Sequence, residues 1–444
     1  MAASHVDSEG ARPHSAYRRS LVHLVVDAPG DSRWNWRASV NLLDQPEAED
    51  PLGITANDWR AGVDGDPVAV RFDTRKSVRS AHAGFSASGT SGLGDWRQAA
   101  SIGTRDVEQF LAIPVAVQAN PRHPGGVIDL GRDSAGWLGT LAFAEGWTLG
   151  AEWGRTQEAR RGYENFVGEQ VGLRGRLRRD EDNRLGTLDA FLLHERQLSA
   201  SWRFDAGVRH GDWQLVSSDR FPANGDDGGR KSLGLWSASA RWRHDGGGFW
   251  RHSFSAGTGR EAPTLNELAY RADGSAGIAT NLTAARTTVL DWRQDWTFGR
   301  VRPELSLWQA EGRDELVPAT NSGGRASFQN AGETRRRGLE GALHWDPADG
   351  HHVDVVGVLI DARFTEAFSF RVATDPLPRV VAAGSRIPGI ARAQGRIAWT
   401  ADWTPETRTQ VSIDAFGDTA ADDRNTVTAP GFASVDVSWR HTLG

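Results

Sequence analysis

Apolar and polar residues alternate along most of this chain with a period of two. In residues 201–209 four apolar side chains alternate with charged ones: Trp202, Phe204, Ala206 and Val208 against Arg203, Asp205 and Arg209. In residues 396–403 the same alternation separates Ile397, Trp399, Ala401 and Trp403 from Arg396, Thr400 and Asp402. Because successive side chains of a β-strand point to opposite faces, each segment predicts a strand with one apolar and one strongly polar face.

Roughly 17 segments of this kind follow one another, and no convincing amphipathic helix interrupts them. They lie near residues 17–26, 34–43, 76–87, 96–110, 136–144, 148–157, 186–195, 198–213, 233–242, 249–257, 289–298, 302–311, 338–345, 352–363, 392–403, 408–416 and 433–441. The sequence therefore predicts an all-β protein with antiparallel strands.

The connections between these segments alternate between short and long. The short ones are rich in Gly, Asp and Pro, which suit tight turns, and lie at 245–248, 298–300, 346–350 and 404–406. The long ones cover residues 44–75, 112–134, 160–185, 216–230, 259–286, 313–334, 364–391 and 418–432. Short turns at one end and long loops at the other are typical of an up-and-down outer-membrane β-barrel.

The polar face of the strands has two possible interpretations. A soluble β-sandwich, for example a carbohydrate-binding or structural protein, would show the same alternation with its apolar face inward. A transmembrane barrel places the apolar face in lipid and the polar face in a wet lumen. Segments of about 9–11 residues match the length of a tilted strand that crosses a bilayer, and favour the transmembrane barrel.

The barrel interpretation predicts which side chains meet lipid. One set of large apolar residues should point outward: Trp250, Phe254, Trp292, Trp296, Leu343, Trp399 and Trp439. A charged set should point into the lumen: Asp205, Arg251, Asp291, Arg293 and Arg396.

The amino-acid composition excludes several classes of function. The chain has 444 residues, of which 39% are hydrophobic, and no apolar run long enough for a membrane-spanning helix. Its 19 Trp residues fit a membrane interface, where amphipathic aromatic rings are enriched. The net charge of -6 argues against a nucleic-acid partner, and zero Cys excludes thiol chemistry and Cys-based metal sites. We expect no catalytic residues, no metal site and no cofactor, and therefore no enzyme.

Four stretches at loop and strand junctions resemble a known family. They are 259–268 (GREAPTLNEL), 330–340 (NAGETRRRGLE), 386–392 (RIPGIAR) and 425–431 (NTVTAPG). Their order and spacing are similar to those of TonB-dependent outer-membrane receptors, although the aromatic-Arg pair of the first signature is replaced by Arg260-Glu261. The resemblance implies a location in the cell outer membrane, contact with outer-membrane lipid, and active uptake of a scarce small ligand.

One branch of this family fits better than the others. Residues 224–227 (NGDD), 267–274 (ELAYRADG) and 322–325 (SGGR) resemble the receptor for pyrroloquinoline quinone and its relatives. Related receptors carry ferric siderophores, ferric citrate, cobalamin or sugars, so the resemblance leaves a quinone or a ferric chelate as the ligand. A passive porin, a barrel adhesin and a non-functional truncated remnant remain alternative interpretations.

Comparison with the family pattern also predicts the extent of the chain. A complete receptor has a signal peptide, a TonB box, a plug domain and 22 barrel strands. Residues 1–444 look like one barrel domain truncated at both ends, covering about strands 4 to 20 and lacking the plug through which TonB would act. We therefore expect unpaired strand edges near residues 17–26 and 433–441.

Candidate ligand-binding residues lie on the long loops. Asn266, Tyr270 and Arg271 share the motif-bearing loop, where Arg offers a planar, permanently charged fork for carboxylates and Tyr offers a stacking face. Arg325 and Arg386 are further candidates, since a small anionic ligand with several carboxylates needs several cations. The alternative for Arg271 is loop scaffolding with Glu267 or Asp273. The basic cluster 174–179 is expected to be neutralised by nearby acids rather than to steer ligands.

Overall fold

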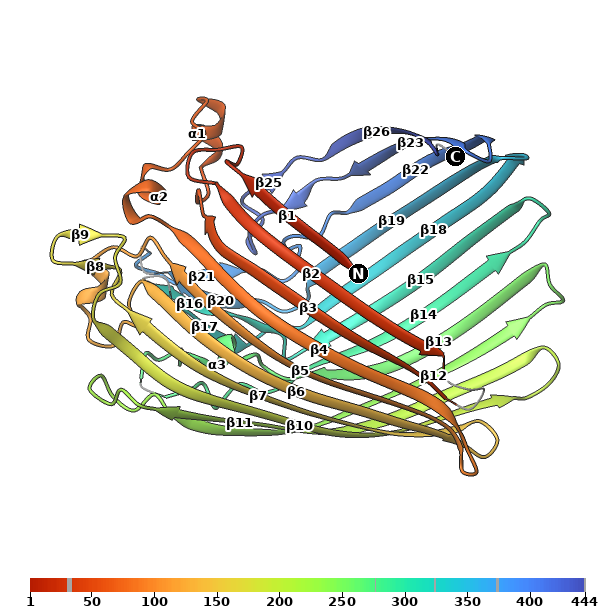
Figure 1. The fold of residues 1–444 in the computed structure, drawn as a ribbon, viewed down its shortest axis with the longest axis horizontal. Coiled ribbons are helices and arrows are strands. Elements are labelled where there is room, and N and C mark those ends of the chain that lie inside the picture. The colour runs from red at the N-terminus through yellow and green to blue at the C-terminus, as the bar shows by residue number, and fades with distance from the viewer. Residues whose placement is uncertain (30–33, 276, 323–324, 373–374, 443–444) are drawn as a thin grey trace.

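The computed structural model describes residues 1–29, 34–275, 277–322, 325–372 and 375–442. An antiparallel sheet of 18 strands dominates it and curves into a barrel-like wall (Figure 1). The strands of this sheet are β1 (Ala2–Ser8), β2 (Tyr17–Pro29), β3 (Trp34–Glu49), β4 (Arg75–Ser91), β5 (Gly94–Phe110), β6 (Val127–Phe143), β7 (Trp147–Tyr163), β10 (Leu177–Gln197), β11 (Trp202–Asp219), β12 (Gly229–Asp245), β13 (Trp250–Glu261), β14 (Ala285–Trp296), β15 (Val301–Arg313), β18 (Thr334–Ala348), β19 (His351–Phe364), β22 (Ala393–Thr404), β23 (Thr407–Phe416) and β26 (Phe432–His441).

Each strand of this sheet pairs with the next one along the chain, so the up-and-down topology predicted from the sequence is confirmed. Short turns join the strands at one end of the wall, and long loops join them at the other (Figure 1). In the part of the chain that the structure describes, no helix is long and apolar enough to cross a membrane.

The N-terminal edge differs from the prediction. Strand β1 pairs with β2 from Ala2↔His23 to Ser8↔Tyr17, so the sheet has one strand more than the sequence predicted, and the N-terminal edge is β1 rather than residues 17–26. The sequence analysis did not predict β1, because Val6 is its single large apolar residue and one residue shows no alternation. At the other edge β26 pairs with β23, and no pairing with β1 occurs among the described residues.

Smaller elements fill the long connections. They are α1 (Ala56–Arg60), α2 (Pro67–Phe72), a 3₁₀ helix (Val117–Ala119), α3 (Leu265–Leu268), and the short strands β8 (Phe166–Val167), β9 (Gln170–Val171), β16 (Leu316–Ser322), β17 (Arg325–Asn330), β20 (Phe368–Val372), β21 (Arg379–Val381), β24 (Thr419–Ala420) and β25 (Thr428–Ala429). Several predicted loops are shorter than expected, because the strands continue past the 9–11 residues that a bilayer requires: β10 has 21 residues.

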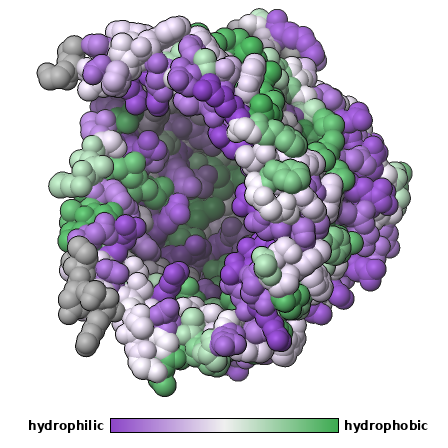
Figure 2. Space-filling model, turned by 90° about the vertical axis from the view of Figure 1, so that its right-hand side faces the viewer, coloured by the Kyte–Doolittle hydropathy of each residue, from purple (hydrophilic) through white to green (hydrophobic). Residues whose placement is uncertain are grey.

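The charged face of the strands lines the lumen, as predicted. Arg293 donates to Asp295 at 2.8 Å and to Glu304 at 2.5 Å, and Asp291 accepts from Ser306 at 2.8 Å. Figure 2 faces the short-turn end and shows a hollow whose wall is largely hydrophilic. On the opposite face, Phe254 and Trp439 are exposed, as residues in contact with lipid should be.

Compact apolar clusters form at the long-loop end rather than in the centre of the barrel. One contains Trp213 and Leu215 of β11 and four residues of the β13–β14 connection: Leu268, Ile278, Ala279 and Leu282. A second joins Val317, Phe364, Phe368 and Val381. These clusters hold the long connections against the inner wall, so the mouth has a defined structure.

Candidate ligand-binding site

The β13–β14 connection, residues 262–284, is anchored to the inner wall and is called the mouth loop here. Its helix α3 begins with a capping box, in which Thr264 Oγ1 accepts from the Glu267 amide and the Glu267 carboxylate accepts from the Thr264 amide. Leu268 and Leu282 are fully buried against β11. A backbone hydrogen bond of 2.8 Å from Ala279 to Leu268 closes the loop on itself. The APTLNEL sequence therefore sets a rigid loop.

A cavity of about 320 Å³ lies beside the mouth loop and is called the mouth pocket here. Tyr270, Arg271 and Asp273 line one side of it. The other walls come from distant segments: Asn120 and His123 of the β5–β6 connection, Asp227 of the β11–β12 connection, Thr320 of β16 and Ser327 of β17. Four long connections thus meet around one small polar cavity.

The acidic groups of the mouth pocket are held by hydrogen bonds of the protein itself. Asp273 accepts from the Ser275 hydroxyl at 2.6 Å and from its amide at 2.9 Å, and these bonds, with the charge of Arg271, lower the pKa of Asp273. Asp227 accepts from the Gly277 amide at 3.1 Å. Both carboxylates already accept hydrogen bonds from the protein, so an incoming ligand meets them as parts of the wall.

Arg271 lies at the edge of the mouth pocket with 42% of its side chain exposed. Its Nε is 3.8 Å from Asp273, a separation too long for a hydrogen bond. Surface ion pairs of this kind contribute about 0–1 kcal/mol, so the contact restrains the guanidinium weakly. The guanidinium at this edge offers a planar fork to a carboxylate that enters the pocket.

Tyr270 packs on a buried arginine that the sequence did not single out. The Arg179 guanidinium lies over the Tyr270 ring at 4.8 Å from its centroid and pairs with Glu181. The Arg179 and Glu181 side chains are only 5% and 2% exposed. Within the described residues, Nη1 of Arg179 is buried and has no hydrogen-bond partner. Tyr270 is thereby fixed by a cation–π contact beneath the mouth pocket.

Arg179 can be noticed in the sequence, because it belongs to the basic cluster 174–179. The sequence analysis expects this cluster to be neutralised by nearby acids rather than to hold Tyr270. Neutralisation does occur, but mostly by residues outside the adjacent acidic run: Arg174 pairs with Glu108 and Asp129, and Arg176 and Arg178 pair with Glu164. The last three residues of the cluster, 177–179, begin strand β10, so alternation places Arg179 and Glu181 on one face.

The remaining candidates lie outside the mouth pocket. Asn266 is exposed in α3 and does not line the cavity. The guanidinium of Arg386 donates to the Asp418 carboxylate at 2.8 Å and to the Asp418 carbonyl at 3.0 Å, and it lowers the pKa of Asp418. The side chain of Arg325 lies outside the described residues. Of the five predicted residues, Tyr270 and Arg271 line the mouth pocket. A ligand-binding role stays a prediction for all five.

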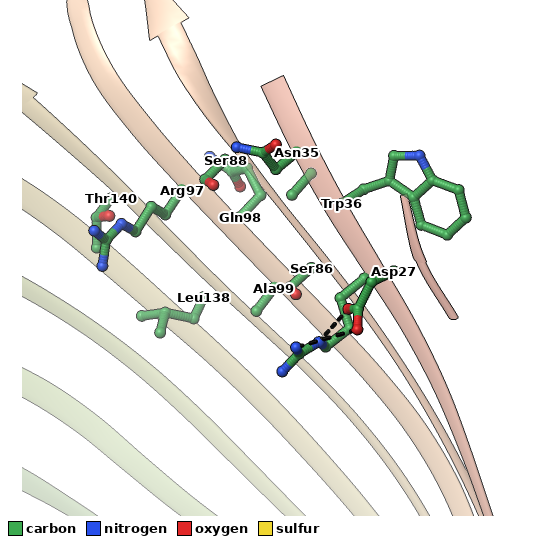
Figure 3. Close-up of a pocket in the computed structure, with 12 residues that line it drawn as sticks. Asp27, Asn35, Trp36, Ser86, Ser88, Arg97, Gln98, Ala99, Leu138 and Thr140 are labelled. Carbon is green, nitrogen blue, oxygen red and sulfur yellow. Dashed lines mark hydrogen bonds and ion pairs between the residues drawn. The ribbon is translucent and has the colours of Figure 1, made fainter. Parts of the chain in front are cut away.

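A larger hollow, about 740 Å³, lies on the inner wall far from these residues in the chain. Figure 3 shows it where β2 to β6 run side by side, with Ser86, Ser88 and Arg97 along the strands and Trp36 pointing away from them. Asp27 and Arg37 form an ion pair of 2.5 Å there. It is an open, concave stretch of wall, and among the described residues no group of three or more His, Asp or Glu is arranged to hold a metal ion.

Comparisons with solved structures agree on the fold. The chain is similar to the siderophore receptor PiuA from Acinetobacter baumannii, with 12% identity and a TM-score of 0.73 over 100% of this chain and 70% of that one. It is also similar to the ferric yersiniabactin uptake receptor FyuA from Yersinia pestis (14%, TM-score 0.70, 98% and 66%). The ferric citrate transporter FecA matches at 14% identity and a TM-score of 0.74, over 100% and 65%. This chain spans about two thirds of their length.

The family model described as "TonB dependent receptor-like, beta-barrel" matches residues 9–443. That range contains every strand of the large sheet except β1. Members of this family are outer-membrane receptors and transporters, not enzymes. This chain belongs to the TonB-dependent receptor β-barrel family and is an outer-membrane protein.

Proposed function

We propose that residues 1–444 form the barrel part of an energy-coupled receptor that captures a scarce, small, anionic ligand at its mouth. The mouth pocket carries this proposal, because four connections from distant parts of the chain converge on it with Arg271 at its edge. TonB would act through a plug domain to release the bound ligand inward. A pore for passive diffusion would not need a structured mouth held by two apolar clusters.

The ligand that we favour carries carboxylates that can bind Arg271 while a flat surface stacks near Tyr270. Guanidinium and carboxylate match as planar partners, and Tyr270 is held in place by Arg179. Pyrroloquinoline quinone, a flat tricarboxylate, has this chemistry, and the 267–274 motif motivates it. Ferric chelates are the second candidate, because the similar receptors named above are described as binding siderophores or ferric citrate.

Arg271→Ala tests the site in the full-length receptor. We expect weaker ligand binding by roughly ten- to a hundredfold, since a charge-assisted hydrogen bond is worth about 1.5–3 kcal/mol. Isothermal titration with pyrroloquinoline quinone and with ferric citrate measures this loss and identifies the ligand.

Arg313→Ala is the matched control. It removes one positive charge at the end of β15, but Arg313 is 63% exposed, pairs with Glu333 at 3.6 Å and lies outside the mouth pocket. Equal, small effects of the two substitutions would reject the site. Binding of ferric citrate without binding of the quinone would reject the preferred ligand and keep the receptor class.

A further inference from the structure

The outer wall carries an unusual patch near the short turns of β7, β10, β11, β12 and β13. Imidazole rings there pack on indole rings: His194 stacks on Trp147 at 4.1 Å, and His244 lies 4.5 Å from Trp202 and 4.8 Å from Trp250. His252 stacks on both Trp250 and His244 at 5.1 Å. These six residues and Arg196 are called the inner-rim patch: Trp147, His194, Arg196, Trp202, His244, Trp250 and His252.

The strand register places the inner-rim patch on the lipid face. Arg203, Asp205 and Arg243 form ion pairs on the lumen side, so their neighbours at alternate positions face outward. Trp202 lies opposite His244, and Trp250 lies opposite Trp296, which puts these rings on one surface. Every patch residue lies within three residues of the short-turn end of its strand.

The place of the patch on its strands and its Trp rings together indicate the depth at which it lies in the membrane. Trp rings settle at the boundary between hydrocarbon and headgroups, so the imidazoles beside them lie at the level of the lipid phosphates. Short turns of outer-membrane barrels face the periplasm, which makes the neighbouring lipids those of the inner leaflet. The partner is therefore a phospholipid headgroup.

The charge of the outer wall here has one sign. At every second position of 147–153, 188–196, 202–210, 236–244, 250–256 and 290–296, which are the outward positions, the sequence has no carboxylate. Glu195, between His194 and Arg196 in the sequence, pairs with Arg203 at 2.7 Å on the lumen side. Glu145 lies at a turn, and Asp245, the last residue of β12, accepts from the Gly248 amide at 3.3 Å. The charged neighbours Arg243, Arg251 and Asp295 alternate to the lumen face. Gln294, opposite His252, is uncharged.

Two of the stacked imidazoles, His194 and His244, have a ring nitrogen that the described residues leave without a partner. Nδ1 of His194 and Nδ1 of His244 are buried and have no hydrogen-bond partner in the described part of the chain. Nε2 is therefore the ring nitrogen that can donate to a group from the membrane. Arg196, an exposed side chain opposite Phe204, adds a permanent charge and forms no ion pair among the described residues.

We propose that the inner-rim patch binds the phosphate groups of anionic phospholipids in the inner leaflet. Arg196 supplies a permanent positive charge, and the ring N–H groups of His194 and His244 supply hydrogen-bond donors. This property is separate from ligand capture at the mouth.

Native mass spectrometry of the purified full-length receptor tests the proposal with phosphatidylglycerol and phosphatidylcholine. One positive charge near a membrane surface is worth about 1 kcal/mol, so we expect roughly fivefold greater retention of phosphatidylglycerol than of phosphatidylcholine. Equal retention of the two lipids would overturn the proposal without any variant. Glycerol phosphate added as a competitor separates binding of a lipid from binding of a free phosphate, and full competition by it would reject a lipid site.

The variant Arg196→Gln/His244→Gln/His252→Gln should lose this preference. His210→Gln is the matched control, because His210 also packs on a Trp of the same wall, Trp236 at 4.3 Å, but lies farther from the short turns. Heat-modifiable migration in electrophoresis confirms that each variant is folded. An unchanged preference in the folded triple variant, or an equal loss in the control, would reject the patch.

Discussion

The long-loop mouth and the short-turn rim differ in how they accommodate charge. At the mouth, cations are buried and matched by acids: Arg179 with Glu181, and Arg178 with Glu164. At the rim, His and Arg side chains lie on the outer wall among Trp rings without acids on the same face. This difference in charge pairing follows from the surroundings, which are the protein interior at the mouth and the membrane surface at the rim. Buried charges are stable only when they are paired, whereas charges at a membrane surface can use lipid phosphates as partners.

Breaking a pair at the mouth gives the largest expected effect. Glu181→Ala leaves Arg179 buried without its carboxylate and should destabilise the mouth by about 3–5 kcal/mol. Asp182→Ala removes the partner of Arg220, which is 62% exposed, and should cost at most about 1 kcal/mol. Protease cleavage within residues 262–284, followed over time in both variants, measures the difference. Equal cleavage rates would show that the buried pair does not hold the loop.

A charge on the lipid face should have the next largest effect. Ala238 points outward near the middle of β12, and Ala238→Arg should cost roughly 2–4 kcal/mol in the free energy of folding into a bilayer. Ser239→Arg places the same side chain in the lumen one residue away and should be nearly neutral. Urea titration of folding into lipid vesicles compares the two variants. A greater loss for Ser239→Arg would reverse our assignment of the two faces.

Acid should loosen the mouth, and this effect is the smallest. Burial alone would raise the pKa of Glu164, but the hydrogen bonds and charges of Arg176 and Arg178 outweigh it and lower the pKa. A lowered folded-state pKa contributes stability above the unfolded value, and that stability is lost as pH falls through the folded value. Loss should therefore begin below about pH 4.5.

Hydrogen exchange of residues 164–176 between pH 6 and pH 3 follows this loosening. Glu164→Gln, which cannot ionise, should show the looser state already at pH 6 and little further change. Loosening of the unaltered chain near pH 6.5 would assign the transition to histidine rather than to Glu164.

The alternation of side chains allowed most of the wall to be predicted from the sequence. Trp202, Arg203, Phe204 and Asp205 have little choice of face, because a slip of one residue would put charges into lipid. The capping box at Thr264 and Glu267 likewise depends on local spacing. The same logic missed β1, since Ala2–Ser8 has too few apolar residues to show a period.

The sequence by itself determined the strands, their faces and their order, because period-two alternation and turn residues are local properties. Only the tertiary structure decided the mouth. It placed Tyr270 on Arg179, 91 positions earlier in the chain, and brought His123 and Asp227 to the same cavity as Arg271. It also bound Arg386 to Asp418 and grouped His244 with His252 on the outer wall. These contacts join side chains from different strands and loops, and no local pattern specifies which long loop folds against which part of the wall.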